Sequence, residues 1–268
     1  MKLTDAIKKS GVSAIVYGES GIGKTHFCGT LPGKTLIIAA EANGIKTLSR
    51  SANADNIEIL YLPQPGKTED ETAAKFNTFF NDLMTGDLDV DNVVLDSATE
   101  LANLLLLLKA DPNRNGGTPT MKNYSDVQFS MRRYLRILRD LAEVRGKNVV
   151  VIALEAELVL SQTADASTTK THPALSGKKL SPEAEGLYDI VAHMEKRTDG
   201  VRVLRLEGTE SFVAKDRFGR RGCLADGKTL LYPEKEQTKA ETAPTSPAPA
   251  TPAKSPETAT TTEKKKDK

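Results

Sequence analysis

The stretch Gly18-Glu19-Ser20-Gly21-Ile22-Gly23-Lys24-Thr25 fits the pattern G-x-x-x-x-G-K-[ST] of a Walker A phosphate-binding loop. An apolar, strand-like run at residues 14–17 comes directly before it, and a helical pattern follows. The motif binds phosphate in this strand–loop–helix setting, because glycines let backbone N–H groups converge and the helix adds its positive N-terminal end. The stretch therefore predicts a nucleotide-binding loop rather than an ordinary glycine-rich turn.

The residue types in this loop predict how it holds a nucleotide. Lys24 is expected to bind the β- and γ-phosphates of ATP, and the Thr25 hydroxyl is expected to bind Mg²⁺. The predicted nucleotide-binding residues are Gly18, Glu19, Ser20, Gly21, Ile22, Gly23, Lys24, Thr25 and the following His26. ATP and Mg²⁺ are thus the predicted cofactors.

A carboxylate that ends an apolar run supplies a second part of this site. The run Val93-Val94-Leu95-Asp96 is typical of a Walker B strand. An Asp at the carboxyl end of a parallel strand lies where open α/β sheets bind their ligands. Asp96 is therefore predicted to hold Mg²⁺ together with Thr25. The alternative is an Asp that only caps the following turn.

Hydrolysis of ATP also requires a group that orients and deprotonates water. Ser97 follows Asp96, so the chain has no acid directly after the Walker B residue. Glu41 ends another apolar run, residues 35–40, and is the predicted catalytic base. A solvated loop acid is the alternative at this position.

Length and patterning predict one α/β domain. The chain has 268 residues, of which 38% are hydrophobic and 27% are charged. Strands are predicted at residues 13–17, 35–40, 58–62, 92–96, 148–153, 190–195 and 202–206. Helices are predicted at residues 24–30, 68–85, 99–110 and 124–145. Their alternation predicts a mostly parallel, doubly wound sheet within a domain of residues 1–232.

Composition separates two connections and a tail from this pattern. Residues 111–123 and 157–181 are expected to be irregular, and long irregular connections are often functional. Residues 233–268 contain six of the 13 prolines and no Val, Ile, Leu, Met or aromatic residue. Such a segment buries too little apolar surface to fold, which predicts a disordered tail.

Charge and hydropathy exclude several classes of protein. A net charge of +1 excludes a strongly basic nucleic-acid coat. The most apolar helical stretch, residues 101–108, is too short to span a bilayer, and no apolar run of signal-peptide length follows the first ten residues. The sequence therefore predicts a cytoplasmic protein without membrane contact.

The order of these motifs resembles a known family. The Walker A loop, a strand that ends in Ala40-Glu41, a strand that ends in Asp96-Ser97, a long helix and a further strand are similar in order to the RecA-like recombinase ATPases. The chain more closely resembles the compact phage nucleotide-binding proteins with a RecA-like core, some of which are single-strand annealing proteins. The resemblance covers about residues 11–221 and implies a RecA-like P-loop NTPase core.

The resemblance implies roles for three residues after the long helix. Glu155 lies where RecA-like proteins carry a polar residue that senses the γ-phosphate, although their residue is Gln. Lys215 and Arg217 match two basic residues, separated by one position, that stabilise transition-state charge on the neighbouring subunit's ATP. The match implies a homo-oligomer, either a ring or a filament. A Lys-Asp-Arg surface cluster is the alternative.

The two irregular connections fall where RecA-like proteins place their DNA-binding loops. The resemblance therefore implies that basic side chains contact the phosphates of single-stranded DNA and that Tyr124 stacks on a base. The basic residues are Arg114, Lys122, Lys170, Lys178 and Lys179. Charges that are merely solvated are the alternative.

The implied function is a Mg²⁺-dependent ATPase that binds single-stranded DNA in phage DNA recombination, annealing or replication, in the host cytoplasm. Its tail could bind a single-strand-binding or replication protein. A nucleotide kinase shares the loop, but it usually needs an Arg-rich lid, and neither long connection is Arg-rich. A nucleotide-dependent scaffold with little turnover stays open as a third class.

Overall fold

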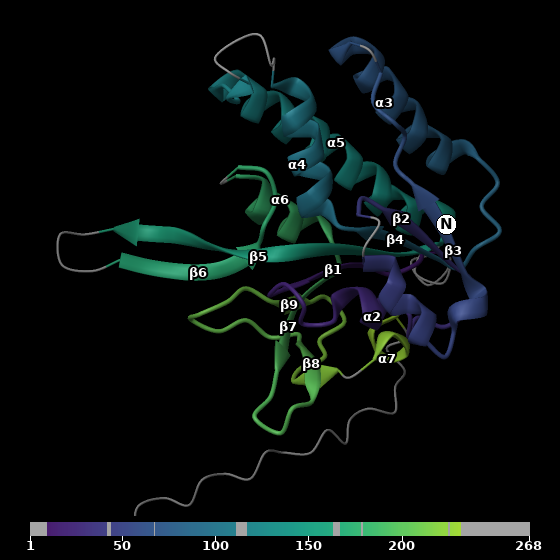
Figure 1. Cartoon of the computed structure of the whole chain (residues 1–268). Helices are drawn as coiled ribbons and strands as arrows, with labels where there is room; N and C mark the ends of the chain where they lie inside the picture. Colours follow the sequence, from purple (N-terminus) through teal and green to yellow (C-terminus); the bar gives the residue numbers. More distant parts are fainter. Residues whose placement is uncertain are drawn as a thin grey trace, which may run out of the picture. The chain divides into compact units, whose positions relative to one another are not determined.

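The computed structural model describes residues 10–41, 44–66, 68–110, 117–162, 167–177, 179–224 and 226–231 (Figure 1). The predicted tail, residues 233–268, and two of the predicted DNA contacts, Arg114 and Lys178, lie outside the described residues. In the described ranges, no helix is long and apolar enough to cross a membrane.

Within the described residues, ten strands form one sheet in the order β10-β8-β7-β1-β5-β4-β2-β3, with β6 beside β5 and β9 beside β7. The strands are β1 (Ser13–Gly18), β2 (Thr35–Ala39), β3 (Ile57–Tyr61), β4 (Asn92–Asp96), β5 (Asn148–Gln162), β6 (Ser167–Pro173), β7 (Ile190–Lys196), β8 (Arg202–Arg205), β9 (Lys215–Asp216) and β10 (Cys223–Leu224). The row from β7 to β3 is parallel, whereas β6, β8, β9 and β10 run antiparallel to their neighbours. The predicted mostly parallel α/β fold is confirmed.

Side chains that alternate along the strands pack into two cores, one on each face of the sheet (Figure 1). Ile15 and Tyr17 of β1 point to the face that packs against α3 (Glu69–Thr85), α4 (Ala98–Lys109), α5 (Met121–Arg145) and α6 (Leu180–Leu187). Ala14 and Val16 point to the face that packs against α2 (Lys24–Cys28), the 3-10 helix η1 (Gly44–Arg50) and α7 (Gly227–Leu231). A second 3-10 helix, η2 (Ala54–Asn56), precedes β3. Burial of both faces explains the near-continuous apolar runs of the central strands.

Polar side chains at the helix ends determine where α4 and α5 begin. Ser97 caps α4 by accepting a hydrogen bond of 3.2 Å from the backbone N–H of Glu100. Thr120 and Asn123 form a capping box, so α5 begins three residues before the predicted residue 124. Gly146, with a left-handed φ of 66°, ends this helix.

The prediction of an irregular connection at residues 157–181 is wrong. β5 continues to Gln162 and pairs with β6 in an antiparallel hairpin, and α6 begins at Leu180. The hairpin extends beyond the rest of the sheet (Figure 1), so its strands do not need the apolar pattern of a core strand. Pro182 is the third residue of α6, in the first turn, where a helix has no acceptor for the N–H that proline lacks.

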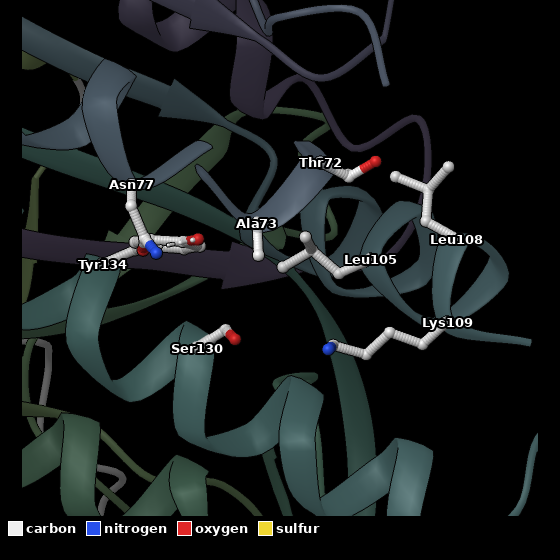
Figure 2. A pocket seen from close by; sticks show the side chains of 8 residues that line it. All are labelled: Thr72, Ala73, Asn77, Leu105, Leu108, Lys109, Ser130 and Tyr134. Carbon is white, nitrogen blue, oxygen red and sulfur yellow. Dashed lines mark hydrogen bonds between the residues drawn. The ribbon is translucent and has the colours of Figure 1, made fainter. Parts of the chain in front are cut away.

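A small cavity of about 40 Å³ lies among α3, α4 and α5 (Figure 2). It is lined by Thr72, Ala73, Asn77, Leu105, Leu108, Lys109, Ser130 and Tyr134. Within it the Tyr134 hydroxyl donates a hydrogen bond of 3.3 Å to Asn77. A water molecule takes up about 30 Å³, so this space is a packing gap with room for about one water molecule.

Buried amides join the amino ends of the central strands. The Asn148 side chain accepts a hydrogen bond of 3.1 Å from the Val12 N–H and donates one of 3.0 Å to Asn92. Asn92 in turn donates to the Pro32 carbonyl at 2.7 Å and to the Thr35 hydroxyl at 3.0 Å. The network links β5, β4 and β2 to the segment before β1 at the edge opposite to the Walker A loop.

We expect Asn148→Ala to lower the free energy of unfolding by about 1–3 kcal/mol, because it leaves buried groups of Val12 and Asn92 without partners. Urea denaturation monitored by circular dichroism measures this change. Asn103→Ala, on an exposed position of α4, is the matched control and should change the free energy by less than ~0.5 kcal/mol. Equal effects of the two substitutions would contradict the structural role of the amide network.

Candidate functional site

The predicted nucleotide-binding loop lies between the end of β1 at Gly18 and the start of α2 at Lys24. Gly21 and Gly23 have φ angles of 76° and 109°, in the left-handed region that glycine adopts without steric cost. The Phe27 N–H donates a hydrogen bond of 2.9 Å to the Gly23 carbonyl and closes the first turn of the helix. The path of the backbone therefore requires glycine at both positions.

The Lys24 side chain is buried against its own loop. Its Nζ donates hydrogen bonds to the carbonyl oxygens of Gly18 at 2.8 Å and Glu19 at 2.7 Å. Burial lowers the pKa of Lys24, and nearby carboxylates, Asp96 foremost, raise it. These carboxylates favour a positive charge at a position where burial alone would disfavour it.

The Thr25 hydroxyl donates a hydrogen bond of 2.7 Å to Oδ2 of Asp96. Asp96 is the last residue of β4, and only β5 separates β4 from β1 in the sheet. Burial raises the pKa of Asp96, while the bond from Thr25 and the charge of Lys24 lower it. The bond brings the Walker A loop into contact with the predicted Walker B residue.

The surroundings of this pair fit a Mg²⁺ ion, which prefers oxygen ligands. The Thr25 hydroxyl and the Asp96 carboxylate supply two oxygens at one place. A Cβ on Gly44 would lie 3.5 Å from Thr25 Oγ1 and 3.8 Å from Asp96 Oδ2, so glycine leaves room beside both. Gly44 belongs to η1, and the sequence pattern does not reveal it because a 3-10 turn has no apolar period of its own.

These groups line one cleft with a volume of about 250 Å³. The lining residues come from the loop, η1 and the ends of the strands: Ser20, Gly21, Gly23, Lys24, Thr25, His26, Glu41, Gly44, Thr47, Asp96, Ser97, Ile152 and Leu154. Of the predicted loop residues, Gly18, Glu19 and Ile22 do not line it. The cleft therefore combines both predicted Mg²⁺-binding residues with most of the predicted phosphate-binding loop.

Glu41 lines the same cleft, two residues beyond the end of β2. Burial raises the pKa of Glu41, the charges of Glu100 and Asp96 raise it further, and Lys24 lowers it. An ionised carboxylate with a raised pKa is a stronger base than an ordinary Glu. The position suits a catalytic base, and that role stays a prediction.

Glu155 lies where β5 stops pairing with β1 and begins to pair with β6. Leu154 still pairs with β1, whereas Glu155 pairs with Pro173 of β6, so the strand does not end before Glu155 as predicted. The Oε2 atom of Glu155 lies 3.0 Å from Nε2 of His193 on β7. The charge of Glu155 also acts on Lys24, which fits a group near the phosphates.

Neither Glu155 nor His193 lines the cleft, and the sequence does not reveal the contact between them. The His193 ring packs against Tyr17, with ring centroids 5.0 Å apart, and against Phe212, with centroids 4.6 Å apart. It contacts Glu155 across 38 positions of sequence, through the sheet. No local pattern predicts such a contact, because it depends on which strands are neighbours.

Lys215 and Arg217 do not line the cleft of their own chain. Lys215 pairs with Val191 near the start of β7, and Val191 pairs with Ile15 of β1. Ile15 lies three residues before Gly18, where the loop begins, which is a distance of about 10 Å along β1 at ~3.3 Å per residue. Arg217 binds Asp189 at 3.3 Å and the Gly186 carbonyl at 2.7 Å. Burial lowers the pKa of Lys215 and the Arg217 charge lowers it further, while Asp189 raises it.

The described residues predicted to contact DNA come from three elements. Lys122 and Tyr124 on α5 and Lys179 before α6 are exposed, and Lys170 on β6 is half-buried. The loop before α6 lies against α5. Gly177 of this loop is so close to the helix that a Cβ atom added to it would lie 3.2 Å from Nε2 of Gln128. Two hydrogen bonds, of 2.6 and 3.0 Å, between Arg132 and Glu183 also join these helices. The segment before α6 therefore lies against the middle of α5, about two to three turns after the helix begins.

We expect Asp96→Asn to stabilise the ligand-free protein and to weaken its binding of Mg²⁺·ATP. Burial raises the pKa of Asp96 above its value in the unfolded chain, so ionisation at neutral pH lowers stability. The melting temperature of Asp96→Asn should exceed that of the wild type at neutral pH, and the difference should vanish below the pKa of Asp in the unfolded chain. The affinity for Mg²⁺·ATP should fall about 10–100-fold. A lower melting temperature of the ligand-free variant at neutral pH would contradict this account.

Comparison with known proteins identifies the family. A family model described as an AAA domain matches residues 10–218, which include the loop, Glu41, Asp96 and Lys215. No curated protein matches the chain. The match extends over most of the chain and includes the whole cleft. The chain therefore belongs to the AAA domain family of P-loop nucleotide-binding proteins.

Proposed function

We propose that this protein is a Mg²⁺-dependent ATPase of RecA-like type that binds single-stranded DNA. One observation carries the ATPase part: the hydrogen bond of 2.7 Å between Thr25 and Asp96 brings two motifs together in the cleft that also contains Lys24 and Glu41. Loop, metal-binding pair and acid are the parts that nucleoside triphosphate hydrolysis requires.

Each residue has a chemical role in this proposal. Lys24 binds the β- and γ-phosphates, and its positive charge offsets the negative charge that develops on them. Thr25 and Asp96 hold Mg²⁺, which supplies further positive charge when it is bound. Glu41 accepts a proton from the attacking water, and Glu155 senses the γ-phosphate, the role that the resemblance in motif order implies.

Lys215 and Arg217 would act on the nucleotide of a neighbouring subunit. Their place in the sheet supports this assignment, because β9 pairs with the start of β7, about 10 Å along the strands from the level of the loop at ~3.3 Å per residue. The Arg217 side chain is about half exposed while its guanidinium binds Asp189. The proposal therefore includes a homo-oligomer, a ring or a filament, in which ATP lies between subunits.

Single-stranded DNA is proposed to bind along the first part of α5, between the start of the helix and the segment before α6 that lies against it. The contact between the loop of Gly177 and Gln128 supports this, because it brings Lys179 to the helix that carries Lys122 and Tyr124. Cations beside an exposed aromatic ring suit a backbone of phosphates with bases that stack. A setting in phage recombination, annealing or replication rests on the resemblance in motif order, as does a replication partner for the tail.

We expect Glu41→Gln to reduce ATP hydrolysis about 10²–10⁴-fold with little change in ATP affinity, because it removes the base but not the loop. Lys24→Ala should abolish binding and hydrolysis together. Phosphate release measures hydrolysis, and equilibrium titration with ATP measures affinity. Glu58→Gln, at an exposed position of β3, is the matched control. Since the pKa of Glu41 is raised and the base acts when ionised, wild-type turnover should fall with decreasing pH sooner than for an ordinary Glu. Turnover retained in Glu41→Gln would show that another group deprotonates the water.

We expect the double substitution of Lys122 and Lys179 by Gln to weaken binding of single-stranded DNA and to make it less dependent on salt. Loss of two phosphate contacts should reduce the slope of log affinity against log salt by about 1.4, at ~0.7 per contact. Fluorescence anisotropy of a labelled oligonucleotide at several salt concentrations measures the slope. Lys75→Gln on α3 is the control. An unchanged slope would remove these lysines from the DNA interface.

A further inference from the structure

Two cations face each other on the β7–β8 hairpin. Lys196 of β7 is the cross-strand partner of Arg202 of β8, and both are exposed. Paired residues of antiparallel strands project from the same face of the sheet, and like charges directly opposite each other destabilise the pair. This arrangement suits a position at which an anion offsets the repulsion.

The other cations of this hairpin have acidic partners. Arg205 forms an ion pair of 2.6 Å with Glu195, and Arg197 forms one of 3.1 Å with Asp199. In the part of the chain that the structure describes, neither Lys196 nor Arg202 forms an ion pair. The Lys196–Arg202 pair is thus the uncompensated part of the hairpin's charge.

Arg202 reaches the Walker A loop of its own chain. A Cβ on Gly23 would lie 3.1 Å from Cδ and 3.2 Å from Nε of Arg202. Gly23, with its left-handed φ of 109°, is the residue directly before Lys24. Arg202 does not itself line the cleft, but it contacts Gly23, which does.

The face of the sheet agrees with this position. Met194, two residues before Lys196, and Leu204, two residues after Arg202, belong to the core that packs against α2. Since side chains alternate along a strand, Lys196 and Arg202 continue this row beyond the core, on the face where the loop leads into α2. The two cations therefore lie on the loop's side of the sheet.

We propose that Arg202, with Lys196 beside it, binds the phosphates of the nucleotide held by the same chain. The inference rests on the proposed nucleotide binding and adds a residue to it. A guanidinium donates two parallel hydrogen bonds to phosphate oxygens, and the phosphates remove the Lys196–Arg202 repulsion. Lys24 approaches the phosphates from within the loop and Arg202 approaches from β8. This contact within one chain is separate from the contact of Lys215 and Arg217 with a neighbour.

Calorimetric titration of the full-length protein with Mg²⁺·ATP, ADP and adenosine tests the proposal. Arg202→Gln should weaken ATP and ADP binding at least about tenfold, because it removes two charge-assisted hydrogen bonds, and leave adenosine binding unchanged. Arg202→Lys should restore part of the affinity, because it keeps the charge but loses the fork. Arg197→Gln, on the same hairpin with its charge already paired, should change affinity by less than about twofold.

Two results would overturn the inference. If Arg202→Gln binds ATP and ADP as the wild type does while Lys24→Ala binds neither, the loop holds nucleotide without Arg202. If Arg202→Gln weakens adenosine as much as ATP, Arg202 contacts the nucleoside and not the phosphates. A wild-type protein that binds no nucleotide would overturn the proposed function itself. Because Arg202→Gln removes the repulsion with Lys196, the ligand-free variant should melt no lower than the wild type, which excludes a loss of folding as the cause of weaker binding.

Discussion

The hydrogen bond between Thr25 and Asp96 depends on the order of strands in the sheet. β1, β5 and β4 are adjacent and parallel, so the carboxyl ends of β1 and β4 reach the same edge with one strand between them. That spacing leaves the Asp96 carboxylate 2.7 Å from the hydroxyl that follows Lys24. Every other group of the cleft is arranged around this contact, since η1 and Glu41 follow β2, the strand beside β4.

Burial and charge oppose each other throughout this cleft. Burial disfavours a charged Lys24 and also a charged Asp96, and each group favours the charge of the other. The two groups hold their opposite charges without a ligand, because removal from water strengthens the attraction between unlike charges. Glu41, at the rim, has its pKa raised by burial and by neighbouring acids. The arrangement suits the binding of a strongly charged ligand better than it suits the stability of the fold.

The sequence pattern of apolar residues predicts the strands of the core but not the polar β5–β6 hairpin. The runs at β1, β2, β4 and β7 were predictable to within about one residue, because strands buried on both faces must be apolar throughout. The β5–β6 hairpin was not, since it extends beyond the core and has no buried face to impose an apolar pattern. β9, β10 and α7 are equally unpredictable, because each is short and is positioned by the strands and loops around it.

The sequence by itself determined the phosphate-binding loop, the two strand-end acids Asp96 and Glu41, and the parallel α/β class. These follow from local chemistry: the glycines, the lysine and the apolar runs act over a few residues. Only the tertiary structure decided which distant groups meet. The contacts of Glu155 with His193, of Gly44 with Thr25 and Asp96, and of Arg202 with Gly23 exist because strands far apart in the chain are neighbours in one sheet. Local pattern carries no information on that order, because pairing between strands is set by the packing of the whole domain.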